Sequence, residues 1–369
     1  MDPSAEEIAE ILGDAYFPTY SKSIQKKLYN FIDQLAFFDQ LYYAKIEFVL
    51  CVSAIFMNLF HGFILSQKSM RKTSSTNVIL LGMALVDVLT MGLRTYANYQ
   101  LLFHYQELTD VCLEPPSYLQ FQLSQLSFKF LEFSRRFSTY LSLSLVSIRA
   151  FAISQSLNPK FHFLTHPQTG YTSILINSII CALLTIPSFF TYQINSSPWF
   201  PSEDCAYPEN YTKPNFFHDS QPLIIFNSFS VDTMLDAVLA KYFPVFLFIL
   251  MTILLISAIR KGSKDQQKSD KTSKLVLFTT ISVGFAEIPV GILYVFRSIN
   301  EQTIGWVIIS ESFVKFCFLI YVFNTACHFL ICYKLSTQYR DIVKSFVKIE
   351  KKLKARIIIS VKSATITNG

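Results

Sequence analysis

Charged side chains interrupt several stretches of the sequence that are otherwise apolar. They are Asp87, Arg94, Glu132, Arg135, Arg136, Lys241, Glu287, Glu311 and Lys315. A charge at the centre of a bilayer costs about 2.5–3.5 kcal/mol on insertion scales, so each one needs a partner or a water-filled cavity. If these residues share a cavity, its positive charges outnumber its negative ones. The chemistry that this pattern indicates is the binding of a ligand with an acidic group or an electron-rich carbonyl.

The same charges have a simpler interpretation as ion pairs within single helices. Glu132 and Arg136 are four residues apart, as are Glu311 and Lys315, and this spacing places both members on one helix face. The binding interpretation assigns six of the charged residues to a ligand pocket: Arg94, Glu132, Arg135, Arg136, Lys241 and Glu287. An amidated peptide would place its carbonyl on an arginine and its own arginine on Glu132 or Glu287.

Catalytic and metal-binding motifs are missing from the sequence. It contains no GxSxG elbow, no HExxH pair and no paired aspartates on facing apolar stretches. No Cys and His spacing resembles a zinc site, and His162 and His166 lie in a loop. We therefore expect a protein that is not an enzyme and has no metal centre of this kind.

The elements that position these charges follow from the composition. The chain has 369 residues, of which 51% are hydrophobic and 16% are charged, whereas a soluble domain usually carries about a quarter charged residues. The apolar residues fall in seven blocks, at 44–66, 77–99, 119–153, 171–193, 236–260, 274–297 and 305–333. Each block reaches the roughly 20 residues that a helix needs to cross a bilayer. The sequence therefore predicts an all-α membrane protein, a bundle of seven transmembrane helices.

The basic residues indicate the orientation of the chain. Most Lys and Arg outside the apolar blocks lie in the segments 67–76, 260–274 and 334–369, and such segments stay on the cytoplasmic side. We expect an extracellular N-terminal tail (1–43), a seven-span domain (44–333) and a cytoplasmic basic tail (334–369) in the plasma membrane. The first block would serve as the insertion signal, because no cleaved signal peptide precedes it. This basic inner face explains the net charge of +6, so nothing indicates nucleic-acid binding.

The sequence of the predicted cytoplasmic segments also indicates contacts with membrane lipids. After the last block, apolar residues recur at helical spacing, at Leu335, Tyr339, Ile342, Val343 and Phe346. This pattern is typical of a short amphipathic helix on the inner leaflet. The basic run 260–274 fits lipid headgroups and can serve partner contacts as well.

Two cysteines and two sequons lie in the predicted extracellular segments. Cys112 and Cys205 both fall on the oxidising side, which favours a disulfide, and the alternative is two free thiols. Asn195 and Asn210 each begin an Asn-X-Ser/Thr sequon, so both are candidate glycosylation sites. Pro198 follows the first sequon closely, which favours Asn210.

Single residues in the blocks carry a resemblance to a receptor superfamily. Asn58 lies in the first block, Asp87 in the second and Arg149 at the end of the third. The fifth and sixth blocks hold Pro244 and Pro289, which we expect at helix kinks, and the seventh holds Asn324. This set resembles the rhodopsin-like G-protein-coupled receptors.

Longer stretches resemble one family within that superfamily. The stretches are 135–141, 147–149, 158–161, 274–282, 286–289, 324–328 and 336–340, and they are similar to the nematode serpentine receptor class W family, a relative of FMRFamide-type neuropeptide receptors. Three positions depart from the superfamily pattern. Ile148 stands where an acidic neighbour of Arg149 is usual, Glu287 where many receptors have a tryptophan, and Thr325 where proline follows the asparagine.

The resemblance implies a function and roles for several residues. It implies a receptor that binds an extracellular ligand, in the first place an FMRFamide-like neuropeptide, and activates a heterotrimeric G protein through Arg149. It also implies a polar cluster of Asn58, Asp87 and Asn324 that can hold a sodium ion, and the alternative is a hydrogen-bonded structural aspartate. Two other functions stay open: an environmental small-molecule chemoreceptor of the same fold, and a polytopic transporter. Against the transporter, we find no internal repeat, and the chain has only 10 Gly.

Overall fold

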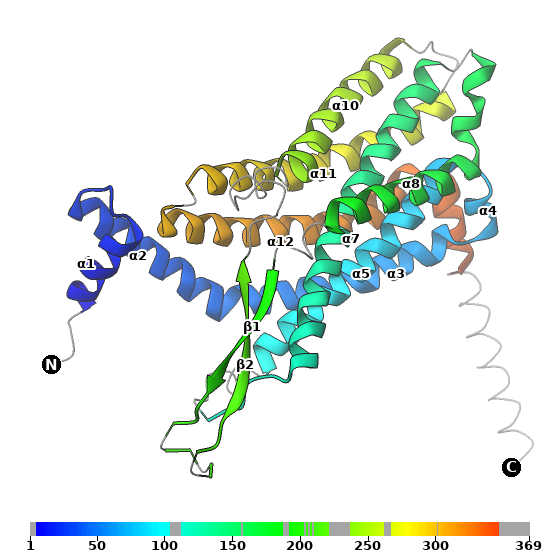
Figure 1. Cartoon of the computed structure of the whole chain (residues 1–369). Coiled ribbons are helices and arrows are strands. Elements are labelled where there is room, and N and C mark those ends of the chain that lie inside the picture. Colours follow the sequence, from blue (N-terminus) through cyan, green and yellow to red (C-terminus); the bar gives the residue numbers. More distant parts are fainter. Residues whose placement is uncertain are drawn as a thin grey trace, which may run out of the picture.

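A helical bundle forms the body of the protein in the computed structural model, as Figure 1 shows. The structure describes residues 5–103, 112–155, 158–186, 192–202, 204–205, 207–208, 210–220, 237–261, 267–300 and 302–346. The helices of the bundle are α3 (Ala44–Leu65), α5 (Ser75–Phe103), α7 (Tyr118–Ser154), α8 (Pro167–Thr185), α10 (Phe243–Lys261), α11 (Gln267–Ile299) and α12 (Ile304–Leu335).

Six of these helices are long and apolar enough to cross a membrane: α3, α5, α7, α10, α11 and α12. This finding concerns the described residues only. The remaining helix, α8, covers the predicted fourth span as far as Thr185. Its first turns hold polar residues such as Gln168 and Thr172, which lower its hydropathy. The predicted end of that span at residue 193 is wrong, because strand β1 begins at Tyr192.

Local sequence signals explain how several helices begin. Ser117 and Gln120 form a capping box at the start of α7, each side chain bonded to the other residue's backbone N–H. Pro244 stands at the second position of α10, which continues without a break from a π-helical turn. This π-helical turn is η4 (Ala237–Tyr242). Pro289, which the sequence predicts at a helix kink, lies inside α11.

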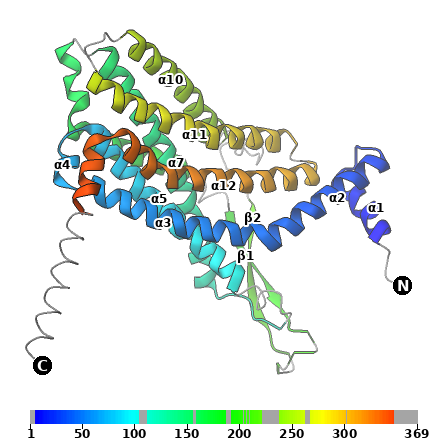
Figure 2. The ribbon, with the colours of Figure 1, turned by 180° about the vertical axis from the view of Figure 1, so that it is seen from behind.

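The segment predicted as an N-terminal tail contains two helices, α1 (Ala5–Tyr16) and α2 (Lys22–Phe38). Helix α2 continues through a π-helical turn, η1 (Asp39–Tyr43), into α3. Phe17 is fully buried and lies 5.6 Å, edge to face, from the ring of Trp306 in α12. Ile32 and Ile309 complete this small apolar cluster. The N-terminal helices are therefore packed onto the bundle (Figure 2).

A two-stranded hairpin projects from the bundle, as both ribbon views show. Strand β1 (Tyr192–Trp199) pairs antiparallel with β2 (Lys213–Ser220), and Asn195 stands opposite Phe217. The connection between the strands carries Cys205. A disulfide joins it to Cys112, with 5.4 Å between the Cα atoms, and this confirms the predicted pair.

The opposite end of the bundle carries the short helix α4 (Lys68–Arg71), the 3-10 helix η2 (Pro159–Thr165) and a helix at residues 337–346. Tyr339 is fully buried in this last helix, and its hydroxyl lies 2.9 Å from His61 Nδ1. Helix α1 and residues 337–346 therefore mark the two ends of the bundle.

We expect Gly305→Ala to loosen the packing of the N-terminal helices. An ideal Cβ at Gly305 would overlap the ring of Phe17, and such overpacking typically costs about 1–3 kcal/mol. Gly92→Ala is the matched control, because a Cβ at Gly92 meets nothing within 4 Å. Thermal unfolding in one detergent and limited proteolysis near Phe17 measure the effect. Equal unfolding temperatures and equal cleavage of the two variants would contradict this packing.

Candidate functional site

A cavity of about 420 Å³ lies between α5, α7, α11 and α12, toward the end that carries the N-terminal helices. We call it the charged cavity, because six charged residues line it: Arg94, Glu132, Arg135, Arg297, Glu311 and Lys315. Its volume falls in the range of roughly 300–1,000 Å³ that is typical of small-molecule sites.

Arg135 is held in the wall of this cavity by contacts on several sides. Its Nε lies 3.5 Å from Glu287 Oε1 in α11. Its guanidinium lies over the rings of Phe318 and Tyr321, 5.6 and 5.7 Å from their centroids. Its Nη2 is buried and makes no hydrogen bond with any described residue. A fixed arginine with a spare donor can bind a carbonyl or carboxylate oxygen.

Arg94 is neutralised by a residue that the sequence analysis missed. Its Nε donates to Glu47 Oε1 at 2.6 Å, and Asn98 Nδ2 donates to Glu47 Oε2 at 2.8 Å. Glu47 is fully buried in the first turn of α3. The arginine also lies 5.2 Å from the centroid of the Phe318 ring. Glu47 lies near the start of the first apolar block, and this position could have identified it as a partner for a charge inside the bundle.

The two helix-internal ion pairs that the spacing suggested are replaced by other pairs. Glu132 Oε2 lies 3.8 Å from Lys129 Nζ, and Glu311 Oε1 lies 3.0 Å from Arg297 Nη1. Lys315 pairs with Asp39 in the turn before α3. Glu47 and Asp39 add two carboxylates to those that the sequence analysis counted, and they pair with Arg94 and Lys315, so the expected positive excess is largely neutralised.

The predicted ligand-pocket residues do not all meet. Arg94, Glu132 and Arg135 line the charged cavity. Arg136 instead donates to the Leu184 carbonyl and the Thr185 hydroxyl, both at 3.0 Å, and so connects α7 to α8. The side chain of Lys241 lies outside the described part of the structure.

Glu287 lines a different cavity. This second space of about 490 Å³ lies between α7, α10 and α11 and is almost entirely apolar. Ile249, Ile253 and Phe285 line it and are largely exposed on the surface of the bundle. We call it the apolar cavity. The Arg135–Glu287 ion pair therefore joins a residue of the charged cavity to a residue of the apolar one.

The three residues of the predicted polar cluster are buried. Asp87 Oδ1 accepts hydrogen bonds from Ser138 Oγ at 2.8 Å and Tyr321 Oη at 3.1 Å, and its Oδ2 lies 3.7 Å from His328 Nδ1. Asn58 donates to the Ala54 carbonyl. The free oxygens of this cluster are Asp87 Oδ2, Asn58 Oδ1 and Asn324 Oδ1, which make no hydrogen bond with described residues.

Each of these oxygens is a ligand of the type that hard cations prefer. The hydrogen-bonded aspartate and the cation site are therefore compatible, because different oxygens of Asp87 serve them. Sequence reasoning missed Ser138, Tyr321 and His328, which only the packing of α7 and α12 brings to Asp87. Among the described residues, no group of three or more His, Cys, Asp and Glu side chains could hold a metal ion.

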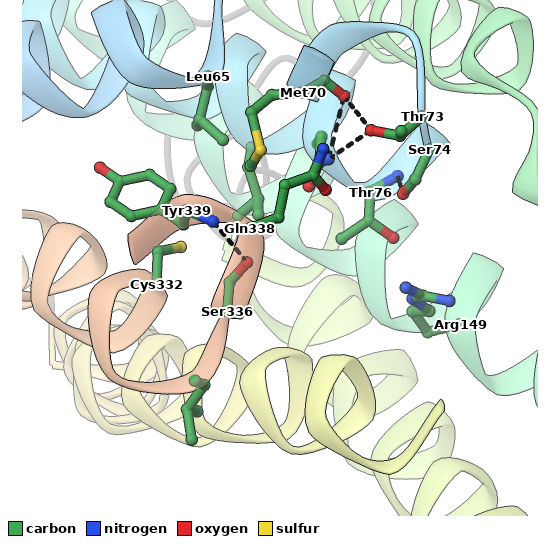
Figure 3. A pocket seen from close by; sticks show the side chains of 13 residues that line it. Leu65, Met70, Thr73, Ser74, Thr76, Arg149, Cys332, Ser336, Gln338 and Tyr339 are labelled. Atoms are coloured by element: carbon green, nitrogen blue, oxygen red, sulfur yellow. Dashed lines mark hydrogen bonds between the residues drawn. The ribbon is translucent and has the colours of Figure 1, made fainter. Parts of the chain in front are cut away.

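Arg149 lies near the opposite end of the bundle, in a third cavity of about 120 Å³. Figure 3 shows its side chain entering from α7, with Thr76 nearby and Tyr339 farther away. Its Nε is buried without a hydrogen bond to a described residue. This end thus presents a cation to a small polar space, which we call the Arg149 cavity.

Besides the disulfide, polar contacts of Glu114 connect the hairpin to the segment before α7. Glu114 accepts hydrogen bonds from Lys213 Nζ at 2.6 Å and from Tyr211 Oη at 2.7 Å. The bond from Lys213, with a smaller contribution from Tyr211, lowers the pKa of the Glu114 carboxyl below its ordinary value. The carboxylate and the disulfide together fix the hairpin to the segment before α7.

The six helices that are long and apolar enough to cross a membrane indicate a polytopic membrane protein. The family described as serpentine type 7TM GPCR chemoreceptor Srw matches residues 45–350, and the chain belongs to this family. The match confirms the resemblance to nematode serpentine receptor class W. The search of curated proteins found no match. The family is a class of G-protein-coupled receptors and not of enzymes, whereas the relation to FMRFamide receptors stays a prediction.

We expect Glu47→Gln to destabilise the protein much more than Glu311→Gln. Glu47 is fully buried with Arg94, whereas Glu311 is half exposed beside Arg297. Breaking a buried pair typically costs about 3–5 kcal/mol, and an exposed pair contributes about 0–1 kcal/mol. Thermal unfolding of both variants and of Glu47→Gln/Arg94→Gln provides the measurement. A similar loss for the two single variants would contradict the different burial of the pairs.

Proposed function

We propose that this chain is a G-protein-coupled chemoreceptor of the plasma membrane that binds a small-molecule ligand in the charged cavity. The description of the family supports this class, and the cavity has the volume of a small-molecule site. The peptide, which the sequence favoured, becomes the second candidate, because a chemoreceptor fits the family description better.

We further propose an orientation with the N-terminus outside and the C-terminus inside. The distribution of basic residues supports it, since α4, the end of α10 and the start of α11 lie toward the end that carries Arg149. The disulfide belongs on the oxidising side, at the opposite end. Asn195 and Asn210 lie in the hairpin region on that same side, as glycosylation would require.

In this proposal α8 is the remaining one of seven spans. It packs against α5 and α7, and a Cβ at Gly170 would lie 2.8 Å from the Ser75 carbonyl oxygen, so the two helices approach closely. Asn177 donates to Ser144 in α7 at 2.7 Å. Residues 337–346 would lie along the inner leaflet as the amphipathic helix, with Tyr339 buried and Lys344 exposed.

The observation that carries the ligand proposal is the free Nη2 of Arg135. This donor is buried and held by Glu287 and two aromatic rings. A ligand carboxylate or carbonyl would supply the acceptor that the described protein does not provide. The carboxylates of Glu132 and Glu311 line the same cavity, so a ligand that also carries a donor or a cation fits. An amidated peptide with an arginine near its end combines both groups.

The signal would travel through the partners of Arg135. A ligand oxygen on Arg135 competes with Glu287 for the guanidinium and so weakens a contact between α7 and α11. Helix α11 contains Pro289, where one backbone hydrogen bond is lost. Binding would thus shift the population toward another arrangement of α11 and open the Arg149 end to a G protein.

We predict that Arg135→Gln and Arg149→Ala abolish ligand-stimulated G-protein activation for different reasons. The first removes the anchor of the ligand and the second removes the contact with the G protein. A panel of small carboxylic acids, ketones and amidated peptides is applied to membranes that contain each variant, and nucleotide exchange is measured at equal surface expression. Glu287→Gln weakens the same contact between α7 and α11, so it is expected to raise activity without ligand and to reduce the further stimulation by ligand.

Lys45→Gln is the matched control, because Lys45 is an exposed cation outside the cavities. Its response is expected to equal that of the wild type. An undiminished response in Arg135→Gln would contradict the ligand site, and one in Arg149→Ala would contradict the coupling role. Direct binding of the active compound separates the two, since only Arg135→Gln should lose it.

We also propose that a sodium ion occupies the polar cluster, held by Asp87, Asn58 and Asn324. A cation there would supply electrostatic stabilisation to the packing of α3, α5 and α12. The thermal stability of the receptor is then expected to be higher in sodium chloride than in choline chloride, and Asp87→Asn should remove the difference. The same difference in the variant would contradict the site.

A further inference from the structure

Arg149 is a partly buried cation without a counter-charge in the part of the chain that the structure describes. It has no ion pair there, and its Nε is buried without a hydrogen bond. It lines the Arg149 cavity, which lies between the end of α3, α4, the start of α5, the ends of α7 and α12, and residues 337–346. Withdrawing part of a charged group from water is costly unless a partner compensates, and the buried Nε of Arg149 has none among the described residues. The cavity therefore favours an anion.

Three hydroxyl groups of the cavity point to the kind of anion. Thr76 is buried, and its hydroxyl donates no hydrogen bond to a described residue. The hydroxyl oxygens of Ser74 and Ser336 accept from the backbone N–H groups of Thr76 and Tyr339, which leaves both O–H groups free to donate. In Figure 3, Thr76 and Ser74 lie on the side from which Arg149 enters, and Ser336 lies across the cavity.

We propose that the Arg149 cavity binds a phosphate group. A phosphate presents several acceptor oxygens to a guanidinium fork and to hydroxyl donors at once, whereas a chloride ion offers no such geometry. The volume of about 120 Å³ is several times the ~30 Å³ share of one water molecule, so an oxyanion fits. Basic residues close to the cavity in sequence extend the positive surface outward, at Lys68, Arg71, Lys72 and Arg340.

A phospholipid of the inner leaflet is the source that the position favours. In the orientation proposed above, the cavity opens at the cytoplasmic end of the helices, where basic pockets bind phosphoinositide headgroups. A free phosphate ion has the same chemistry and is the alternative source. The inference rests on that orientation, but its test needs neither a receptor ligand nor a G protein. Its failure is therefore distinct from the failure of the proposed function.

The test uses the full chain in nanodiscs of phosphatidylcholine. Dioctanoyl phosphatidylinositol 4-phosphate is the lipid probe and inorganic phosphate is the free-ion probe. Binding is measured by native mass spectrometry and by the shift in unfolding temperature. The wild type should bind the lipid probe, and Arg149→Gln should weaken binding about tenfold or more, the scale of losing a charge-assisted hydrogen bond. Thr76→Val should weaken it less.

Two further variants keep the proposal falsifiable. Arg340→Gln removes a cation from the same face but not from the cavity lining, and binding should change less than about threefold, since a rim charge contributes little. Arg149→Lys keeps the charge without the fork and should retain binding in part. An unfolding temperature of Arg149→Gln equal to that of the wild type without the probe excludes misfolding as the cause of the loss.

Three results would overturn the proposal. Equal binding by Arg149→Gln and the wild type would exclude the cavity, and equal losses in Arg149→Gln and Arg340→Gln would indicate only a diffuse basic surface. Binding of inorganic phosphate that depends on Arg149, without binding of the lipid probe, would overturn the lipid as the source.

Discussion

The neutralisation of charges inside an apolar bundle is the constraint on which the rest of this structure depends. A charge in a bilayer requires a partner, a donor or a wet cavity, and the chain places charges in most of its apolar blocks. Glu47 meets Arg94 and Asn98, Arg135 meets Glu287, and Asp87 meets two hydroxyl groups. Each charge therefore specifies a contact that the fold has to form.

These contacts also determine which helices are neighbours. Inside a membrane the hydrophobic effect does not drive helices together, so packing and polar contacts between helices specify the arrangement. Glu47 connects α3 to α5, Arg136 connects α7 to α8, and Asp87 connects α5 to α7 and α12. The same residues that are costly in the bilayer thus position the walls of the charged cavity.

The sequence predicted the spans well because hydropathy is a local property. The block 44–66 corresponds to α3 at Ala44–Leu65, and the disulfide between Cys112 and Cys205 also formed as expected. The partners of the charges were harder to predict. Lys315 could be matched by spacing to Glu311, yet it pairs with Asp39, which is distant in sequence. Helices α1 and α2 escaped prediction because they lie outside the apolar blocks and depend on packing against Trp306.

The Arg135–Glu287 pair is a place where these constraints and the proposed function meet. It links a residue of the charged cavity to a residue of the apolar cavity, and Glu287 stands two residues before Pro289. A group that binds Arg135 changes the electrostatic environment of Glu287, and a buried carboxylate that loses part of its counter-charge must find other donors or move. Because the helix is already weakened at the neighbouring proline, movement of α11 is the less costly response. A ligand contact at one end of the bundle can in this way alter the spacing of helices at the other end, where Arg149 lies.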